Sequence, residues 1–177
     1  NNSKSIALSV WNVTPKNVMG YEKAVEWNGL IGAFGFIVTF SIAFYLAKLA
    51  KKYGAKIIHF VCLLLGAVSF LWFPIVKNQY VFFAVIIGYG IAWASMMGIP
   101  YLMVVAVVPK ERYGVYMGII NMMIVIPMII QNLSFGYILK NFLDNDPRQA
   151  ITFAGVLLVL AALCTLLIKI KKTNVSE

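Results

Sequence analysis

Four side chains in two long apolar stretches have the chemistry needed to hold an uncharged polar ligand. Trp93, Met97 and Tyr101 recur every fourth residue and so share one helical face, with Tyr89 close by in the same stretch. Asn121 lies in the next apolar stretch. An aromatic ring packs on the C–H surface of such a ligand, while hydroxyl, indole and amide groups hydrogen-bond to its hydroxyls. Tyr89, Trp93, Tyr101 and Asn121 are therefore candidate substrate-binding residues.

Each of these assignments has a structural alternative. Asn121 could instead hydrogen-bond to a neighbouring helix, and Trp93 could fill a gap between helices, as polar and aromatic residues do in helical bundles.

Glu26 is the acidic residue nearest to an apolar core. Carboxylates inside a membrane are costly and usually functional, which makes Glu26 a candidate for gating or coupling. Its alternative is a position among the lipid headgroups, beside the tryptophan Trp27 as an interface anchor.

The sequence contains no constellation of residues that predicts catalysis. There is one histidine, His59, and there are six acidic residues, with no Ser/His/Asp set and no glycine-rich phosphate loop. The two cysteines, Cys62 and Cys164, lie inside apolar runs without metal-ligand spacing. We predict a protein that is not an enzyme and that has no catalytic residues, no bound metal and no cofactor.

The composition predicts an integral membrane protein. The 177 residues are 62% hydrophobic and 12% charged, against about 45–50% and about 25% in ordinary globular domains. A transmembrane helix needs about 20 predominantly apolar residues. Uncharged runs of that length are Trp27–Ala47, Ile57–Val76, Asn78–Pro109, Tyr113–Leu139 and Gln149–Ile168. The predicted fold is therefore an all-α membrane protein with five transmembrane helices.

The predicted organisation is a single helical bundle with two short flanking segments. The bundle covers residues 21–172, with helices at about 21–50, 56–76, 79–108, 112–140 and 148–170. Residues 1–20 are expected to be an external loop that includes the end of a missing helix. Residues 173–177 are expected to be a cytoplasmic tail.

The net charge of +9 is interpreted as a topology signal, because the basic residues lie at the ends of the spans. Nucleic-acid binding is not expected. Cytoplasmic loops of membrane proteins are enriched in lysine and arginine. One side of the predicted bundle carries Lys48, Lys51, Lys52, Lys56, Lys110, Arg112, Lys169, Lys171 and Lys172, and the other carries fewer. The C-terminus is thus predicted to be cytoplasmic and Asn1 external.

Prolines and small residues in the third and fourth runs predict helices that face protein or water. Pro100 and Pro127 each lie inside an apolar run and leave a backbone carbonyl without its donor. Lipid cannot satisfy such a carbonyl, whereas a neighbouring helix or a water-filled cavity can. This arrangement is typical of a transporter or channel interior.

Small residues at helical spacing predict close contacts between helices in the same two runs. Gly90 and Ala94 share one helical face in the third run, as do Gly114 and Gly118 in the fourth. We expect all four to be packed against a neighbouring helix.

Two stretches resemble major facilitator transporters. The segment G-I-A-W-A-S-M-M-G-I-P-Y, followed by P-K-E-R-Y-G-V-Y-M-G-I-I-N-M-M-I-V-I-P, resembles their tenth and eleventh helices. It is most similar to the branch of sucrose/proton symporters and glycoside–pentoside–hexuronide cation symporters. The segment L-A-K-K-Y-G-A-K resembles the cytoplasmic loop motif L-A-D-R-x-G-R-K. Two positions depart from the family: Met128 replaces a common glutamine, and Lys51 replaces the acid of a gating ion-pair network.

This resemblance implies that the five helices form most of the C-terminal six-helix half of such a transporter. The implied function is secondary active transport of a sugar or glycoside, as cation-coupled symport by alternating access. The implied partners are the sugar, a coupling proton or sodium ion, the lipid bilayer and the missing N-terminal half of the same protein. The implied location is the cell membrane, with several passes. The second and fifth helices are expected outermost, with Leu157, Leu158 and Leu163 facing lipid.

Two other functions remain open from the residues. The first is efflux of a hydrophobic drug or metabolite, which the methionine-rich candidate face and Met128 would suit. The second is a non-transport membrane scaffold, although long partner-binding loops are not seen in the sequence.

Overall fold

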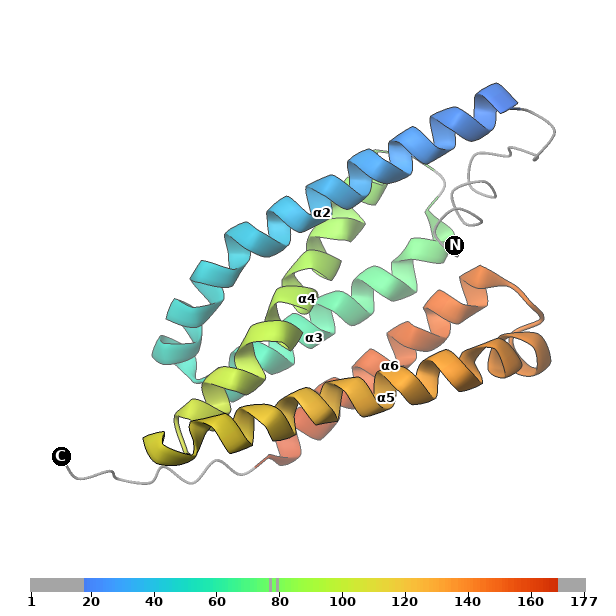
Figure 1. Ribbon diagram of the computed structural model, residues 1–177. Helices are drawn as coiled ribbons and strands as arrows, with labels where there is room; N and C mark the ends of the chain where they lie inside the picture. The colour runs from blue at the N-terminus through green and yellow to red at the C-terminus, as the bar shows by residue number, and fades with distance from the viewer. Residues whose placement is uncertain (1–17, 77, 79, 169–177) are drawn as a thin grey trace.

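The computed structural model describes residues 18–76, 78 and 80–168, and these residues form a bundle of long helices (Figure 1). The helices in chain order are α2 (Val18–Tyr53), α3 (Ala55–Trp72), η1 (Phe73–Ile75), α4 (Val81–Val105), η2 (Lys110–Arg112), α5 (Tyr113–Phe142) and α6 (Pro147–Leu167). No strand occurs within these ranges. All five α-helices are long and apolar enough to cross a membrane. The predicted all-α membrane fold with five transmembrane helices is confirmed.

Each helix expected from the sequence has a counterpart, with shifts at the ends. Helix α2 begins at Val18 and so includes residues 18–20, which the sequence analysis places in an external loop. It continues to Tyr53, three residues past the predicted end at about residue 50. The predictions for residues 1–17 and 169–177 lie outside the described residues.

Local chemistry explains where neighbouring helices are separated. Gly54 has a positive φ of 93°, a conformation that glycine adopts without strain, and it divides α2 from α3. At the other end of the bundle Asp144 and Asn145 also have positive φ in the turn before α6. The Asp146 side chain then accepts a hydrogen bond from the backbone N–H of Arg148, and Pro147 occupies the first turn. These are the usual features of a helix N-terminus.

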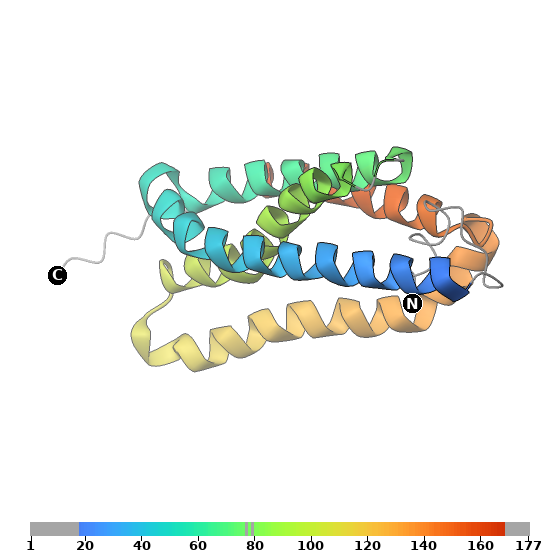
Figure 2. The ribbon, with the colours of Figure 1, turned by 90° about the horizontal axis from the view of Figure 1, so that it is seen from above.

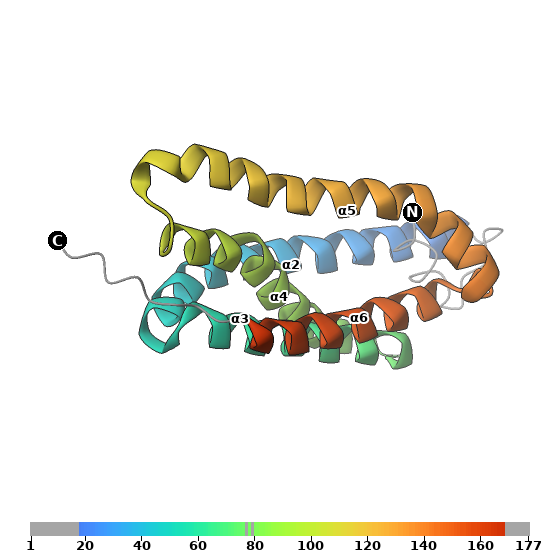
Figure 3. The same cartoon turned by 90° about the horizontal axis from the view of Figure 1, so that it is seen from below.

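Helix α3 lies at the centre of the helix contacts. It packs against α4 and α6 over long interfaces and against α2 over a shorter one, while α2 also packs along α4. Figures 2 and 3 show that consecutive helices run in alternating directions across the picture, so that α2 and α4 point the same way. Helix α5 contacts mainly α4 and lies to one side of the other helices.

Small residues allow a close crossing between α2 and α4. A Cβ atom added at Gly90 of α4 would lie 3.1 Å from Val38 Cγ1 and 3.2 Å from the Gly35 carbonyl oxygen of α2. Thr39 supports this crossing, because the single hydrogen of its hydroxyl lies between the carbonyl oxygens of Gly35 and Gly90, at 2.9 Å and 3.3 Å from Oγ1. Ala94, one turn further along α4, is also buried. The expectation that Gly90 and Ala94 are packed against a helix is therefore confirmed.

The same expectation is wrong for Gly114 and Gly118 of α5. A Cβ atom added at either position would have no neighbour within 4 Å in the described part of the chain. Helix α5 instead meets α4 through the hydrogen bond between the side chains of Tyr101 and Asn121. Spacing alone therefore does not distinguish a packed small-residue face from an open one.

The core divides into two parts along the bundle. Near the α2–α3 turn, a cluster of buried side chains joins three helices: Leu46, Ala50, Cys62, Ala94 and Ile99. At the opposite end Val76, Phe82 and Val85 form a second cluster. Edge-to-face aromatic contacts from Trp27 to Tyr80 and Phe83 join α2 to α4 there.

Helices α3 and α6 each have a packed face and an exposed apolar face. Leu157 and Leu163 of α6 are exposed, whereas Leu158 is half-buried and lies close to Gly66 of α3. The expectation that all three leucines face outward is thus wrong for Leu158. The reason is that α6 packs along α3 through this position.

The two prolines lie within unbroken helices. Helix α4 continues past Pro100 to Val105, and α5 continues past Pro127 to Phe142. Pro100 is half-buried and Pro127 is exposed.

Candidate substrate-binding face

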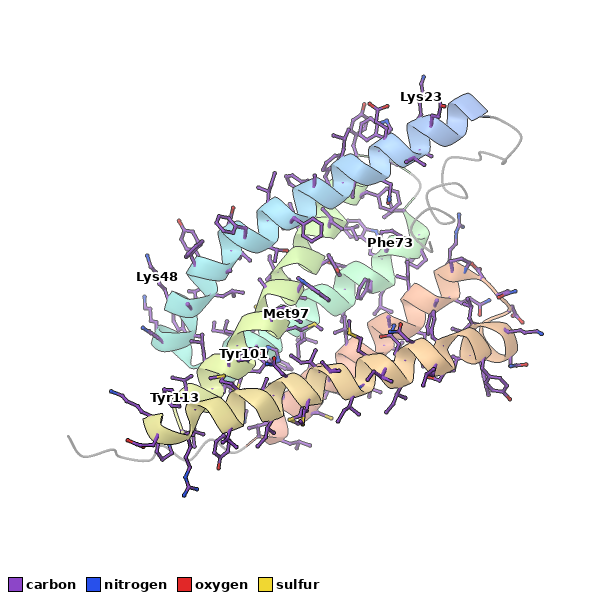
Figure 4. The ribbon with its side chains drawn as sticks, in the orientation of Figure 1. Lys23, Lys48, Phe73, Met97, Tyr101 and Tyr113 are labelled. Carbon is purple, nitrogen blue, oxygen red and sulfur yellow. The ribbon has the colours of Figure 1, made fainter. Side chains whose placement is uncertain are left out.

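Among the candidate residues of α4, Tyr101 is hydrogen-bonded to α5, whereas Tyr89 packs against α3. Trp93 and Met97 are exposed, with 38% and 40% of their surface accessible, while Tyr89 and Tyr101 are half-buried. Figure 4 labels Met97 and Tyr101 where α4 comes nearest to α5. We call Tyr89, Trp93, Met97 and Tyr101 the α4 face. The opposite side of α4 is occupied by residues such as Ser95 and Ile99, which pack into the bundle.

Tyr89 and Trp93 form a stacked pair on this face. Their ring centroids are 6.0 Å apart and their planes differ by 25°. Tyr89 also packs against Phe70 of α3, with centroids 5.5 Å apart. Tyr89 therefore packs against the indole of Trp93 as well as against Phe70, and the exposed part of Trp93 remains available to a ligand. Stacked aromatic pairs of this kind hold their rings in a defined orientation.

Tyr101 and Asn121 form a hydrogen-bonded pair between α4 and α5. The Tyr101 hydroxyl donates to Asn121 Oδ1 at 2.5 Å. The alternative that Asn121 bonds to a neighbouring helix is therefore realised. This hydrogen bond uses only the side-chain oxygen of Asn121, and the side-chain nitrogen carries two N–H donors besides. Asn121 is exposed, so those donors can reach a ligand.

A second hydrogen bond ties the start of α5 to the end of α4. The Tyr113 hydroxyl donates to the Val105 carbonyl oxygen at 3.2 Å. Both links lie near the same end of the two helices, so the orientation of α5 relative to α4 is fixed there. The position of Asn121 relative to Tyr101 follows from that arrangement.

The α4 face offers hydrogen-bonding groups and aromatic surface without charge. Helix α4 contains no acidic or basic side chain over Val81–Val105. Within the described residues no group of three or more His, Cys, Asp or Glu side chains could hold a metal ion. The aromatic, hydroxyl and amide groups of the α4 face and of Asn121 suit an uncharged ligand with hydroxyls and C–H surface.

Glu26 is not brought together with the other four candidates. It is exposed near the start of α2, at the end of the bundle where Trp27 contacts Tyr80 and Phe83. Trp93 lies almost three helical turns beyond Phe83, and Tyr101 two turns further still. Glu26 is therefore placed at the mouth of the bundle, beside the aromatic residues expected at a membrane boundary.

The structure also contains a polar contact that the sequence analysis did not identify as a site. His59 Nδ1 of α3 lies 2.7 Å from Ser95 Oγ of α4, and Ser95 is completely buried. Cys62, one turn after His59, is buried beside them. The signal in the sequence is a serine inside an apolar helix, since a buried hydroxyl in a bundle needs a partner. The His59–Ser95 contact lies on the opposite side of α4 from the α4 face, so it positions that helix.

Taken together, five membrane-spanning helices and an uncharged face with paired aromatic and amide groups define a multi-pass membrane protein with a candidate ligand site. Residues 6–132 match the family model described as Major Facilitator Superfamily, which is well over half of the chain. The chain belongs to this superfamily, whose members are membrane transporters. No curated protein and no solved structure matches the chain.

Proposed function

We propose that this chain is part of a secondary active transporter for a sugar or glycoside, working as a cation-coupled symporter by alternating access. Membership of the superfamily gives transport across a bilayer. The choice of substrate is supported mainly by the hydrogen-bonded pair Tyr101–Asn121, which lies on the same side of α4 as the stacked pair Tyr89–Trp93. Together the two pairs present ring surface, amide donors and a phenolic oxygen.

The separation of the two pairs favours a substrate with more than one ring. Trp93 and Tyr101 are eight residues apart, or about 12 Å along a helix. A pyranose stacked on the exposed face of Trp93 would leave a second ring near the Asn121 amide. Hydroxyl groups of that ring can accept from the amide nitrogen and donate to the Tyr101 oxygen. Discrimination would be strong, because a site built around polar groups rejects analogues that leave them unpaired.

The proposed cycle rocks two helical halves around this face. In this proposal a second helical half supplies the facing wall, and a proton or a sodium ion is the coupling ion. Glu26 is the proposed gating or coupling residue within this chain, since its exposed carboxylate lies at the mouth of the bundle. The proposed location is the cell membrane, with the lysine-rich end and the C-terminus cytoplasmic.

Efflux of a hydrophobic compound is the second candidate. It is favoured by the exposed methionines near the same site, because Met97 of α4 and Met128 of α5 both have accessible thioether side chains. Methionine surfaces adapt to varied apolar ligands. Sugar transport is preferred because an apolar ligand would leave the Asn121 amide donors without partners.

The deciding experiment is transport by the complete protein in reconstituted vesicles. We expect uptake of a labelled disaccharide that increases with an imposed proton or sodium gradient and is competed by unlabelled glycosides. A hydrophobic cation should not be transported. Export of the hydrophobic cation without disaccharide uptake would refute the proposal in favour of efflux, and transport of neither would exclude both substrates.

A further inference from the structure

A dense basic turn joins α2 to α3. Four lysines occur within nine residues there: Lys48, Lys51, Lys52 and Lys56. The first three are exposed and Lys56 is half-buried. Gly54 reverses the chain between them, and a Cβ atom added to it would have no neighbour within 4 Å, so the turn is open on that side. We call these four lysines the basic turn.

The basic turn lacks counter-charges. The sequence has no Asp or Glu between Glu26 and Glu111, so α2 beyond Glu26, the whole of α3 and the whole of α4 carry no carboxylate. Among the described residues none of the four lysines pairs with a carboxylate, and Lys52 instead lies over the ring of Tyr53, 5.0 Å from its centroid. An unbalanced cluster of ammonium groups attracts an anionic partner.

The adjoining face of α3 identifies the kind of partner. Its exposed large side chains recur at intervals of three and four residues and so form one apolar stripe: Ile57, Val61, Leu65, Val68 and Trp72. No polar side chain interrupts the stripe. From Ile57 to Trp72 it extends about 22 Å, most of the hydrocarbon thickness of a bilayer. The stripe ends at a tryptophan, which is typical of the opposite membrane interface.

We propose that the basic turn binds the headgroup of an anionic phospholipid whose acyl chains lie along the apolar stripe of α3. The stripe begins at Ile57, immediately after Lys56, so the lysines lie at the level of the headgroups of lipids that contact α3. Clusters of lysines next to a transmembrane helix attract anionic lipids in this way. A soluble anion would use only the ammonium groups, and an acidic protein would leave the stripe uncovered.

The proposal departs from the role implied by the resemblance. The family motif has an acid at the position of Lys51, where it takes part in an ion-pair network. A lysine at that position removes the internal counter-charge and raises the positive charge of the turn. The inference is independent of the transported substrate, so it stands or fails separately from the proposed sugar transport.

The test compares lipid retention by the full chain in a neutral detergent. Native mass spectrometry would measure retention of phosphatidylglycerol against phosphatidylcholine of the same acyl chains. We expect a preference for phosphatidylglycerol of about tenfold or more. The double variant Lys51→Gln/Lys52→Gln should lose most of that preference, and Lys51→Arg/Lys52→Arg should keep it. The matched control is Lys110→Gln/Arg112→Gln, where Glu111 already balances one charge and little change is expected.

Further measurements distinguish a bound phospholipid from a soluble anion and from an acidic protein. Short-chain phosphatidylglycerol should be retained poorly, because it cannot follow the stripe; equal retention, or competition by inorganic phosphate, would reassign the turn to soluble anions. Carbodiimide cross-linking of these lysines to another polypeptide would reassign it to an acidic protein. Equal retention of both long-chain lipids by the unmodified chain, or an unchanged preference in the glutamine variant, would overturn the proposal. Circular dichroism of each variant checks that the helices are intact.

Discussion

The hydroxyl of Tyr101 on α4 donates a hydrogen bond to the side-chain oxygen of Asn121 on α5, although twenty residues separate them in the chain. This bond orients the Asn121 amide, because holding its oxygen fixes where its nitrogen points. The same bond limits how far α5 can move from α4. A packing role and a binding role for Asn121 are therefore compatible, and they can be separated by measuring stability and affinity in the same variants.

Tyr101→Phe should remove the bond while keeping the ring. Side-chain hydrogen bonds between membrane helices contribute about 0.6 kcal/mol on average, so a small loss of thermal stability is expected. The apparent affinity for a transported glycoside should fall several-fold, because the amide is no longer held. Asn121→Leu should reduce stability by a similar amount and affinity by more, because the amide donors are also lost, and the double variant should lose little more than Asn121→Leu alone.

Tyr116→Phe is the matched control for this prediction. Tyr116 is an exposed tyrosine on α5. Its substitution should change neither the thermal stability nor the apparent affinity for the glycoside. Full additivity of Tyr101→Phe and Asn121→Leu would show that the two side chains act independently and would contradict the predicted coupling.

Gly90→Leu should disrupt the protein far more than Gly118→Leu. At Gly90 even a Cβ atom would press on Val38 and on the Gly35 carbonyl of α2, and overpacking of this kind costs about 1–3 kcal/mol or more. At Gly118 the described part of the chain leaves the space open. The measurement is the yield of monodisperse protein by size-exclusion chromatography. Equal yields from the two variants would show that the α2–α4 crossing is not as close as described.

Ser95→Ala should destabilise the folded chain, because it leaves His59 Nδ1 without the Ser95 hydroxyl as its partner. Ser95 is completely buried and lies 2.7 Å from His59 Nδ1, so its removal strands a ring nitrogen between α3 and α4. The expected cost is about 1–2 kcal/mol. Ser134→Ala is the control, because within the described residues the Ser134 hydroxyl bonds only to the Ile130 carbonyl of its own helix and is partly accessible. Thermal unfolding in detergent should separate the two variants, and identical midpoints would rule out a stabilising role for the His59–Ser95 contact.

The sequence predicts the elements of this fold better than their contacts. Composition and run length alone indicate five spans, because the need to satisfy backbone groups in lipid leaves helices as the only solution for such runs. Contacts depend on the register between helices, which no single helix encodes. Gly90 and Gly118 lie in the same kind of small-residue pattern, yet only Gly90 meets a neighbouring backbone.

The residue types of the candidate site can likewise be predicted from the sequence, but the contacts between them cannot. The chemical types of Trp93, Tyr101 and Asn121 can be recognised from the sequence, but the Tyr101–Asn121 bond depends on where α5 crosses α4. His59 escapes recognition as a buried contact because it follows the lysines of the α2–α3 turn by only one helical turn. Its neighbour in space, Ser95, is distant in sequence. Only the packing of α3 on α4 brings the two together.

The proposed orientation predicts opposite accessibility for the two ends of the bundle. Figure 4 places Lys23 and Lys48 at opposite ends of α2, and the basic turn lies at the Lys48 end. A cysteine introduced at Lys51 should react with a membrane-impermeant maleimide only from the cytoplasmic side. A cysteine at Asn145, in the turn before α6, should react only from outside. Cys62 and Cys164 are replaced by serine beforehand, and external labelling at position 51 would reverse the topology.

Trp93 provides the most direct test of the binding face. Its ring stacks on Tyr89 on one side and is exposed elsewhere, about two turns before the Tyr101–Asn121 pair. Trp93→Phe should keep an aromatic ring against Tyr89 but lose the indole N–H donor. A hydrogen bond of this kind contributes about 0.5–1.5 kcal/mol, so the apparent affinity should fall about three- to tenfold with the maximal rate largely kept. Labelled-glycoside uptake in vesicles gives both quantities.

Trp93→Ala should abolish transport while the protein still inserts in the membrane, because both the stacking surface and the donor are lost. Trp72→Ala is the matched control: Trp72 is an exposed tryptophan at the end of α3, on the stripe assigned to lipid, and its loss should leave uptake nearly unchanged. Protein in the membrane fraction is quantified for each variant, so that a folding defect is not mistaken for a binding defect. Normal uptake by Trp93→Ala would mean that the indole only packs against Tyr89, and the substrate site would then have to lie away from the α4 face.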